Sequence, residues 1–254
     1  MSDKFQVVCY FHPFTFYFFP SFRLKPMDSI YSVPDLVMTQ DGSFTLFSKQ
    51  HGVTYHSRYG AIQESNHVFI DSGFLPVTKE KDTISIIEIG FGTGLNVLLT
   101  WKNKEVKKNL TIKYHSFDIF PLPESILNAC VYRELLNIPT YVSDQILKSS
   151  WDIDVQVDEQ FSLKKICKDI LKENLPSNFY DVVYFDAFSP ESQPELWSTY
   201  IFEKLFVAMQ QGGILVTYCA KGEVKRTLKK IGFTLESLPG PPGKREMTRA
   251  TKPF

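Results

Sequence analysis

The chain has 254 residues, of which 43% are hydrophobic and 22% are charged, and its 28 basic side chains balance its 28 acidic ones. This composition excludes a disordered, collagen-like or coiled-coil chain and fits an ordinary globular protein. The four cysteines form no CxxC pair, which argues against a zinc ribbon and a disulfide framework. We therefore expect reduced thiols in a cytoplasmic protein that needs no metal.

Residues 1–26 differ from the rest of the chain because residues 5–22 form an uncharged, aromatic-rich run that contains two prolines. Only Lys4 precedes this run, no small-residue cleavage site follows it, and prolines disfavour a spanning helix. We expect neither export nor membrane association. Residues 1–26 are interpreted as a disordered N-terminal extension or as the product of an upstream start.

Residues 27–80 are expected to form a small β-rich cap. Turn signals at Asp41-Gly42 and at Gly52 separate short apolar alternations, and a helical turn is expected around residues 61–69. The segment is denser in Tyr, His, Ser and Glu than a simple connection requires. These polar side chains make the cap a candidate for part of a functional site.

Residues 81–254 alternate apolar strands with helical stretches, which predicts an α/β fold with a doubly wound, mostly parallel sheet. Pro194 suits a first helical turn, and Gly212-Gly213 suits a stop before the next strand. Residues 151–170 are expected to form a hairpin or a strand leading to Asp169. The other strands are expected at 84–89, 112–119, 180–185, 213–218 and 233–238, and the helices at 94–105, 124–135, 194–210 and 223–231.

A glycine-rich turn follows the first of these strands, in the sequence IEIGFGTGLN. Glycines permit close backbone approach, and the following helix offers free N–H groups, so this context favours a nucleotide-like cofactor over a simple tight turn. The spacing is GxGxG, with Glu88 two positions before Gly90, and not the GxGxxG of dinucleotide-binding proteins. It is the pattern of class I S-adenosylmethionine-dependent methyltransferases, which the chain resembles.

Two further acidic residues, Asp118 and Asp169, lie at the ends of predicted strands. Asp118 follows the second strand, 24 residues after Gly94, where a carboxylate can accept both hydroxyl protons of a ribose; the alternative is a solvated strand end. Asp169 resembles the acid that these methyltransferases place near the adenine amino group, although no glycine accompanies it.

Asp186 is the strongest candidate for chemistry, since it ends the buried strand YDVVYF and begins the sequence DAFSP. The carboxyl end of a parallel strand beside the first one is where doubly wound sheets place their ligands. A carboxylate there could accept an N–H of an amine nucleophile and orient its lone pair. The alternative is an Asp that caps the following helix.

Five segments together narrow the resemblance: DGS, YHS and GAIQES within residues 41–65, then IEIGFGTGLN, SFDIFPL, DVVYFDAFSPESQPELW, and TYCAKGEVKRTLKKIGF with PGPPGKREM. Over about residues 36–250 the chain resembles the methyltransferases of the MnmC and MnmD family. This resemblance implies a Rossmann-like fold and conversion of 5-aminomethyl-2-thiouridine to 5-methylaminomethyl-2-thiouridine at the wobble position of tRNA. The enzymes that install the 5-aminomethyl and 2-thio groups are then expected to be functionally coupled to it.

The resemblance also implies roles for individual residues. S-adenosylmethionine is expected as the cofactor, without FAD, because the chain ends soon after its basic segment and leaves no room for an oxidase domain. Asp186 is the expected catalytic residue. The expected cofactor-binding residues are Glu88, Gly90, Gly92, Thr93, Gly94, Asn96, Asp118, Asp169 and Asp186, and the expected substrate-pocket residues are Tyr55, His56, Ser57, Glu64, Phe188 and Pro190.

The C-terminal part is basic: residues 221–252 contain nine basic side chains and three acidic ones. Such a segment is either a solvated surface or an electrostatic contact for a polyanion. Given the resemblance, we expect it to contact phosphates of the tRNA anticodon stem-loop. The expected contacts are Lys221, Lys225, Arg226, Lys229, Lys244 and Arg245.

Three other functions stay open at this point. A spermidine-synthase-like aminopropyltransferase would use a related fold and an acid at the same strand end, but has no reason to carry a basic C-terminal edge. An N-methyltransferase for small-molecule amines would also fit the site. A noncatalytic RNA-binding module would keep the basic residues but would not need the intact glycine turn and Asp186.

Overall fold

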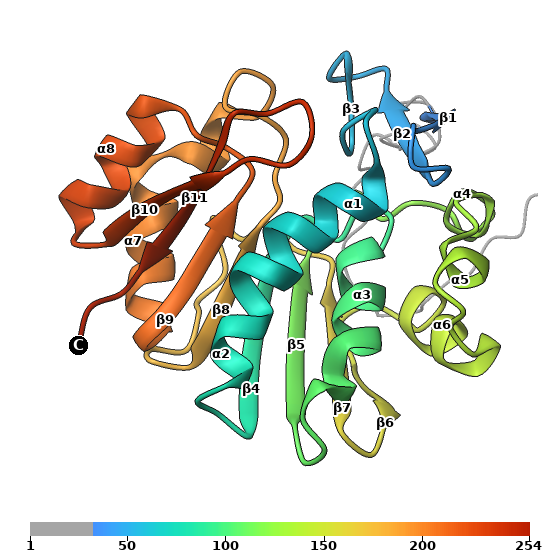
Figure 1. Cartoon of the computed structure of the whole chain (residues 1–254), viewed down its shortest axis with the longest axis horizontal. Helices are drawn as coiled ribbons and strands as arrows, with labels where there is room; N and C mark the ends of the chain where they lie inside the picture. Colours follow the sequence, from blue (N-terminus) through green and yellow to red (C-terminus); the bar gives the residue numbers. More distant parts are fainter. Residues whose placement is uncertain (1–32) are drawn as a thin grey trace, which may run out of the picture. The chain divides into compact units, whose positions relative to one another are not determined.

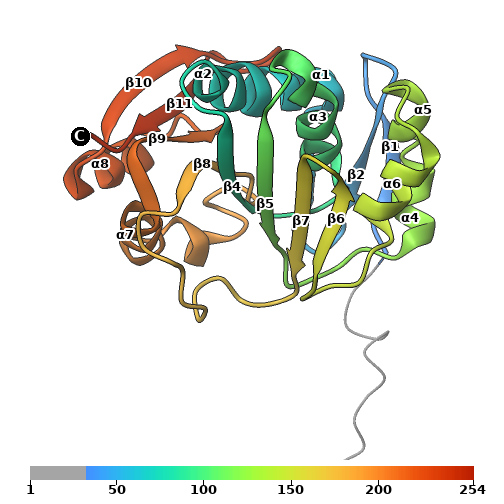
Figure 2. The ribbon, with the colours of Figure 1, turned by 90° about the horizontal axis from the view of Figure 1, so that it is seen from below.

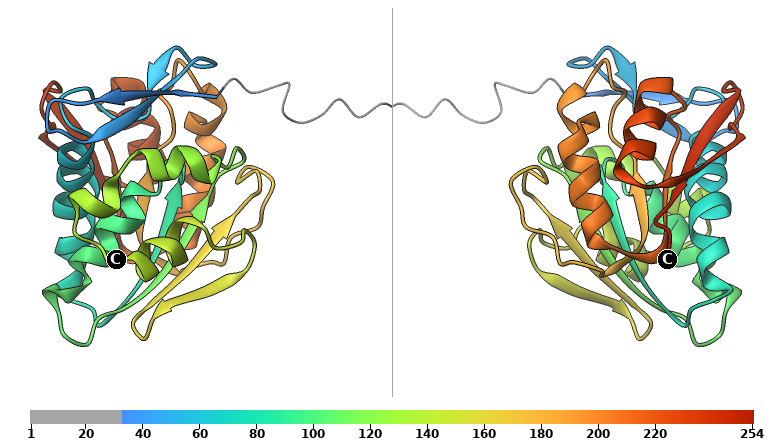
Figure 3. Two further views of the ribbon diagram at one scale, coloured as in Figure 1. Left: turned by 90° about the vertical axis from the view of Figure 1, so that its right-hand side faces the viewer. Right: turned by 90° about the vertical axis from the view of Figure 1, so that its left-hand side faces the viewer.

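The computed structural model describes residues 33–254, so the interpretation of residues 1–26 lies outside the described part of the chain. A small antiparallel sheet comes first, with strands β1 (Asp35–Met38), β2 (Phe44–Ser48) and β3 (Val53–Thr54) in the order β1-β2-β3. This sheet confirms the expected β-rich start, and it lies at one end of the molecule (blue in Figure 3).

The main sheet has eight strands in the order β10-β11-β9-β8-β4-β5-β7-β6. Strands β9, β8, β4, β5 and β7 run parallel to one another, whereas β6 pairs antiparallel with β7, and β11 pairs antiparallel with both β9 and β10. The expected doubly wound, mostly parallel sheet is therefore confirmed (Figures 1 and 2). Its strands are β4 (Thr83–Ile89), β5 (Thr111–Phe117), β6 (Asp154–Asp158), β7 (Phe161–Ile166), β8 (Tyr180–Phe185), β9 (Met209–Thr217), β10 (Thr234–Pro239) and β11 (Glu246–Thr251).

The helix that joins the two sheets is longer than the expected turn at 61–69. It runs through α1 (Ala61–Ser65), a π-helical segment η2 (Asn66–Phe74) and α2 (Leu75–Thr78). Gly73 and the proline in the first turn of α2 do not end it. The segment stays helical because it buries a continuous apolar face against the sheet, including Val68, Phe69 and Phe74.

Two expected helices were wrong in detail, and one was missed. The expected helix at 124–135 is two short helices, α4 (Glu124–Ala129) and α5 (Tyr132–Leu135), because Val131 has a left-handed backbone with φ of 48°. The missed helix, α6 (Thr140–Leu147), begins after Pro139. The helix that follows the glycine turn, α3 (Leu95–Asn103), forms as expected and ends in a 3₁₀ turn, η3 (Lys104–Val106).

The expected helix at 194–210 is also divided, into a 3₁₀ turn, η4 (Pro194–Trp197), and α7 (Thr199–Ala208). Strand β9 begins directly at Met209, so Gly212 and Gly213 lie within the strand and do not separate it from the helix. The parallel register between β8 and β9 shifts between Tyr180 and Val182, opposite this glycine pair, and Gly212 has φ of 75°. The glycines thus accommodate an irregular strand.

The C-terminal region forms α8 (Gly222–Ile231), as expected, and then a hairpin of β10 and β11. Strand β11 was missed because polar residues such as Glu246 and Arg249 interrupt its apolar positions. It inserts between β10 and β9, which brings the loop at 240–245 next to the first helix. The hairpin expected within 151–170 is confirmed by β6 and β7.

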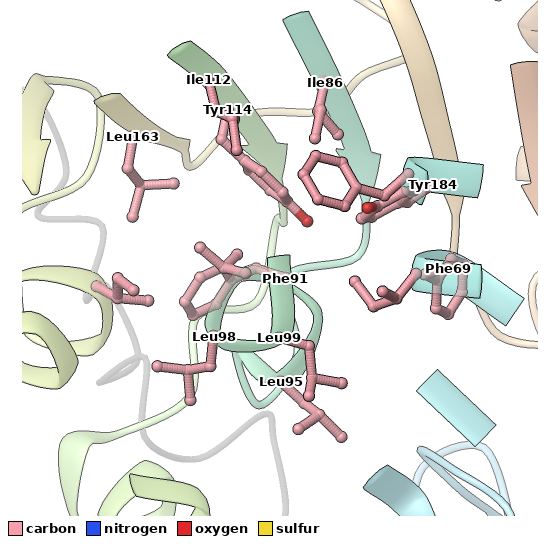
Figure 4. Close-up of a cluster of buried hydrophobic side chains, with 14 of the residues drawn as sticks. Phe69, Ile86, Phe91, Leu95, Leu98, Leu99, Ile112, Tyr114, Leu163 and Tyr184 are labelled. Carbon is pink, nitrogen blue, oxygen red and sulfur yellow. The ribbon is translucent and has the colours of Figure 1, made fainter. Parts of the chain in front are cut away.

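The core lies on both faces of the main sheet. On one face Ile84 and Ile86 of β4 pack with α3 and the first helix, and on the other Ile87 and Ile89 pack with α7 and α8. Figure 4 shows the first face, where the rings of Tyr114 and Tyr184 meet edge to face with centroids 6.0 Å apart. Because both faces are covered, the carboxyl ends of the parallel strands are left for a site.

Candidate active site

The turn between β4 and α3 is built from glycines with positive φ. Gly90, Gly92 and Gly94 have φ of 97°, 49° and 74°, respectively. A Cβ at Gly90 would lie 2.7 Å from the carbonyl oxygen of Asp186, so a side chain at this position would collide with the neighbouring strand end. The turn is therefore closed tightly against the loop that carries Asp186.

Asn96, in the first turn of α3, links two carboxyl groups. Its Nδ2 donates to Glu88 Oε1 at 3.0 Å and to Asp186 Oδ2 at 2.8 Å, while Ser116 Oγ donates to Glu88 Oε2 at 2.5 Å. Burial raises the pKa of Glu88 to about 8 and that of Asp186 to about 7, although these hydrogen bonds act in the opposite direction. Both carboxyl groups can therefore hold a proton near neutral pH.

The Oδ1 atom of Asn96 is buried and has no hydrogen-bond partner within residues 33–254. An unpaired buried acceptor is costly, so this atom is ready to accept from a ligand group with N–H or O–H donors. It lies on the residue that also holds Glu88 and Asp186. The cradle of glycine backbone and polar side chains therefore fits a polar ligand.

Asp118 comes directly after β5 and faces the glycine turn. Its Oδ2 accepts from the Gly92 amide at 3.0 Å, and its Oδ1 accepts from the Phe120 amide at 2.8 Å. Burial raises the pKa of Asp118, and the backbone hydrogen bonds oppose this shift. The structure thus places the Asp118 carboxylate against the glycine turn.

Asp169 is not connected to this network by any hydrogen bond or ion pair that involves its carboxylate in the described part of the chain. Its Oδ1 accepts from the Leu171 amide at 3.0 Å, and its Oδ2 pairs with Lys172 at 3.1 Å. Both partners belong to the turn that Asp169 itself begins. In this structure Asp169 stabilises its local turn.

The loop after β8 is held by hydrogen bonds to its backbone. The Asp186 amide donates to the Ile89 carbonyl at 3.0 Å. The Tyr218 hydroxyl donates to the carbonyl of Ala187 at 2.9 Å, and Trp197 Nε1 donates to that of Phe188 at 2.7 Å. Hydrogen bonds with Ile89, Tyr218 and Trp197 therefore fix the start of the loop that leads to Pro190.

The N-terminal cap covers this site through aromatic contacts. Tyr55 packs against Gly92, where a Cβ would lie 3.4 Å from its ring, and against Phe188 with centroids 5.0 Å apart. His51, which the sequence analysis missed, lies 4.4 Å from the Phe188 ring, and its Nδ1 is 3.2 Å from the Ser192 carbonyl oxygen. No motif marked His51, because its partners lie far along the chain.

The other three predicted cap residues, His56, Ser57 and Glu64, make hydrogen bonds within the cap. His56 is buried against β2, with Nδ1 3.3 Å from Thr45 Oγ1, and burial lowers its pKa to about 4. The Ser57 amide donates to Glu64 Oε2 at 2.6 Å. Glu64 is buried in α1 and carries its charge toward the loop at 240–245.

Lys244 pairs with Glu64 instead of pointing to solvent. Its Nζ lies 2.6 Å from Glu64 Oε1 and 3.9 Å from the centre of the Tyr218 ring. Two more of the six basic residues are also paired, Lys221 with Glu191 and Lys225 with Glu246. The remaining three, Arg226, Lys229 and Arg245, are exposed.

A buried lysine was also missed. Lys165 on β7 is 1% exposed, donates to the Leu147 carbonyl at 2.9 Å, and lies over the rings of Phe91 and Trp151. Burial lowers its pKa to about 8. The alternation of Phe161, Leu163 and Lys165 along β7 was the available signal, since it turns all three to the same face.

Within residues 33–254 no group of three or more His, Cys, Asp or Glu side chains could hold a metal ion. No helix in that same part is long and apolar enough to cross a membrane.

Comparison with known proteins gives one consistent relationship. The family model of S-adenosyl-L-methionine-dependent methyltransferases matches residues 136–253. The bifunctional tRNA 5-methylaminomethyl-2-thiouridine biosynthesis protein MnmC of Burkholderia multivorans is 31% identical over 84% of this chain and 34% of its own length. The Ralstonia nicotianae protein of the same name is 30% identical over 90% of this chain and 35% of its own. The chain thus spans about a third of the length of these relatives.

A solved structure agrees with these relatives. The crystal structure of MnmC2 from Aquifex aeolicus superimposes with a TM-score of 0.67 and 30% sequence identity, over 88% of this chain and 72% of that chain. The similarity therefore extends over most of both chains.

Proposed function

Because the chain belongs to the family of S-adenosylmethionine-dependent methyltransferases that includes MnmC2 of Aquifex aeolicus, we propose that it methylates the wobble uridine of tRNA. The reaction would convert 5-aminomethyl-2-thiouridine to 5-methylaminomethyl-2-thiouridine. The observation that carries this proposal is the Asn96 amide, which joins Glu88 and Asp186 beside the glycine turn. This arrangement supports the proposal, because Asp186 could bind an amine while the glycine turn beside it holds the cofactor.

The cradle would hold S-adenosylmethionine, which supplies a methyl group already activated by its sulfonium. The glycine turn and the free acceptor Asn96 Oδ1 would bind its amino-acid end, and Asp118 would bind its ribose. Asp169 is proposed near the adenine, which requires its carboxylate to exchange a local contact for the ligand. The full proposed set is Glu88, Gly90, Gly92, Thr93, Gly94, Asn96, Asp118, Asp169 and Asp186.

Asp186 would act on the substrate amine. A primary ammonium has no lone pair, so it must lose a proton before it can attack, and an ionised Asp186 can accept an N–H hydrogen bond from the free amine. Asn96 and the fixed backbone of residues 186–188 hold the carboxylate in place. Asp186 thus contributes mainly orientation, which is the larger part of catalysis when the methyl donor is already reactive.

The cap would enclose the extruded base. Tyr55 and Phe188 present aromatic faces at the site, which suits stacking of a flipped nucleobase. Pro190, His56, Ser57 and Glu64 complete the proposed pocket, with His56 as a packing residue beneath it. Residues 27–80 are accordingly proposed as a cap on a methyltransferase domain formed by residues 81–254.

The anticodon stem-loop would bind the basic C-terminal region. Arg226, Lys229 and Arg245 would supply phosphate contacts from helix α8 and the loop before β11. Lys221 and Lys225 would first have to exchange their acidic partners, while Lys244 is engaged at the site itself. We propose a cytoplasmic enzyme that works after the enzymes that install the 5-aminomethyl and 2-thio groups.

The test is incubation of the purified chain with labelled S-adenosylmethionine and tRNA that carries 5-aminomethyl-2-thiouridine, followed by mass spectrometry of the nucleosides. A product one methyl group heavier, lost in Asp186→Ala, is expected. Asp154→Asn is the matched control, because Asp154 lies on the distant β6 and pairs with Lys164. Transfer only to small amines, or transfer of an aminopropyl group from the decarboxylated cofactor, would overturn the tRNA assignment.

A further inference from the structure

An ion pair between distant parts of the chain lies beside Asp186. Glu64 comes from α1 and Lys244 from the loop between β10 and β11, and the two residues are 180 positions apart. The Glu64 side chain is 7% exposed and the Lys244 side chain is 34% exposed, so the pair is partly buried. Such a pair is held in one geometry and is weakly screened by salt.

Each member of the pair has a second contact that fixes it. Glu64 accepts from the Ser57 amide through its other oxygen, and Lys244 Nζ lies 3.9 Å from the centre of the Tyr218 ring. Tyr218 in turn donates to the carbonyl of Ala187, the residue after Asp186. The pair is therefore connected to the catalytic loop through a single aromatic side chain.

The backbone of the 240–245 loop holds Lys244 in this position. The Lys244 amide donates to the Pro241 carbonyl at 2.9 Å, and the Gly240 amide donates to the Arg245 carbonyl at 3.1 Å. His67 Nε2 lies 2.8 Å from the Pro239 carbonyl oxygen, which ties the start of the loop to the first helix. The inward position of Lys244 thus follows from the shape of the loop.

The ionisable and polar groups that face Asp186 come from six elements. Among the described residues, Lys244 is the cation that acts on the Asp186 carboxyl, and Glu64 is the acid that opposes it. The other facing groups are Asn96 on α3, Glu88 on β4, Tyr114 on β5 and Tyr218 after β9. The two members of the ion pair therefore act on Asp186 with opposite signs.

We propose that Glu64 and Lys244 form a positioning pair that sets the ionisation of Asp186 for the substrate amine. Lys244 stabilises the ionised Asp186, and Glu64 both anchors Lys244 and balances its charge. Without Glu64 the lone ammonium would repel an incoming substrate ammonium, and without Lys244 two carboxylates would face each other. The inference rests on the proposed role of Asp186 as the group that receives the amine.

Single and double substitutions test this proposal, because it predicts that the two single variants shift the pH dependence of kcat in opposite directions. In Lys244→Met the acidic limb of the kcat profile should move up by about one pH unit, so activity below the limb falls about tenfold and recovers at higher pH. In Glu64→Gln the limb should move down, because Lys244 is then unopposed. In the double variant the limb should return close to its wild-type pH, whatever the absolute rate, and Lys244→Arg should leave the pH of the limb unmoved.

The experiment measures single-turnover rates across pH for these proteins at saturating S-adenosylmethionine and tRNA. In parallel, ¹³C-carboxyl NMR titrates Asp186 in the free protein, with the signal assigned by its loss in Asp186→Asn. Arg249→Met, which breaks the surface pair with Glu236, is the control for ion-pair loss and should leave the titration unchanged.

Opposite shifts in the single variants that cancel in the double variant would support the proposal. Equal losses of rate at every pH, with an unmoved Asp186 titration, would overturn it and leave the pair as a structural tether. If the wild type methylates no tRNA, the proposed function fails, while the carboxyl titration still decides whether the pair controls Asp186.

Discussion

The side-chain nitrogen of Asn96 lies 2.8 Å from a carboxylate oxygen of Asp186. The same nitrogen also serves Glu88, so one amide orders two carboxyl groups that come from different strands. The amide donates a hydrogen bond to each carboxyl group and carries no charge of its own. It thereby lowers the free-energy cost of holding the two carboxyl groups close together, because two carboxylates without a shared donor would repel each other. Asn96 is therefore the residue on which the geometry of the site depends.

Replacement of Asn96 by Ala should lower kcat/KM by roughly a hundredfold, because both carboxyl groups lose a positioned donor. Steady-state kinetics with the modified tRNA measure this. Asn103→Ala is the matched control on the same helix, where the side chain donates only to the Leu99 carbonyl. Equal losses in the two variants would show that helix stability, and not the site, is affected.

Gly90→Ala should weaken S-adenosylmethionine binding by at least about a hundredfold, because the new Cβ meets the Asp186 carbonyl oxygen at 2.7 Å. Isothermal titration calorimetry gives the affinity. Gly42→Ala is the control, since Gly42 also has positive φ but a Cβ there would have no neighbouring atom within 4 Å. It should cost about 1 kcal/mol of stability and leave binding intact. Unchanged affinity in Gly90→Ala would contradict the proposal that the glycine turn binds S-adenosylmethionine.

Stability should fall as pH rises through the range in which Glu88 ionises. Its pKa is raised from 4.5 to about 8, so the folded protein binds more protons than the unfolded chain. The contribution is fully present below pH 4.5 and is lost as pH rises through about 8, at up to about 1.4 kcal/mol per pH unit. Urea unfolding at about pH 5.5 and about pH 8.5 should show a smaller decline in Glu88→Gln. If the free energy of unfolding declined equally in the variant and the wild type, the decline would not come from the raised pKa of Glu88.

Tyr55→Ala should raise the Kd for S-adenosylmethionine by about tenfold, because it uncovers Gly92 and removes the contact with Phe188. Tyr55→Phe should bind nearly as well as the wild type, since the contacts are made by the ring. Tyr141→Ala, an exposed position on α6, serves as the control. The interpretation fails if the affinity does not change in Tyr55→Ala.

Arg226→Ala and Lys229→Ala should each reduce the slope of log Kd against log salt concentration for tRNA by roughly 0.7 to 0.9. Filter binding over a range of salt concentrations measures the slope. Lys148→Ala should not change it, because Lys148 pairs with Asp144 on α6. If all three variants have the wild-type slope, the basic helix does not contact phosphates.

Local sequence patterns predicted the parallel sheet well. Strand β8 matched the predicted range at both ends, and β4 differed by one residue. These strands are buried on both faces, so apolar residues predominate in both and make them easy to recognise in the sequence. Strand β11 and helix α6 were missed because half-buried elements mix polar and apolar residues, and their burial depends on neighbours far along the chain.

In the candidate site, too, some residues could be predicted from the local sequence, whereas the contacts between distant residues could not. The sequence by itself determined the glycine turn and the strand-end acids Glu88, Asp118 and Asp186, because strand–turn–helix geometry follows from residues that are close in the chain. Only the tertiary structure decided that Lys244 faces Glu64, that His51 faces Phe188 and that Asn96 joins two carboxyl groups. Contacts of this kind form when β11 inserts beside β9 and the cap closes over the turn, and the net charge or motif of a segment carries no information on such distant partners.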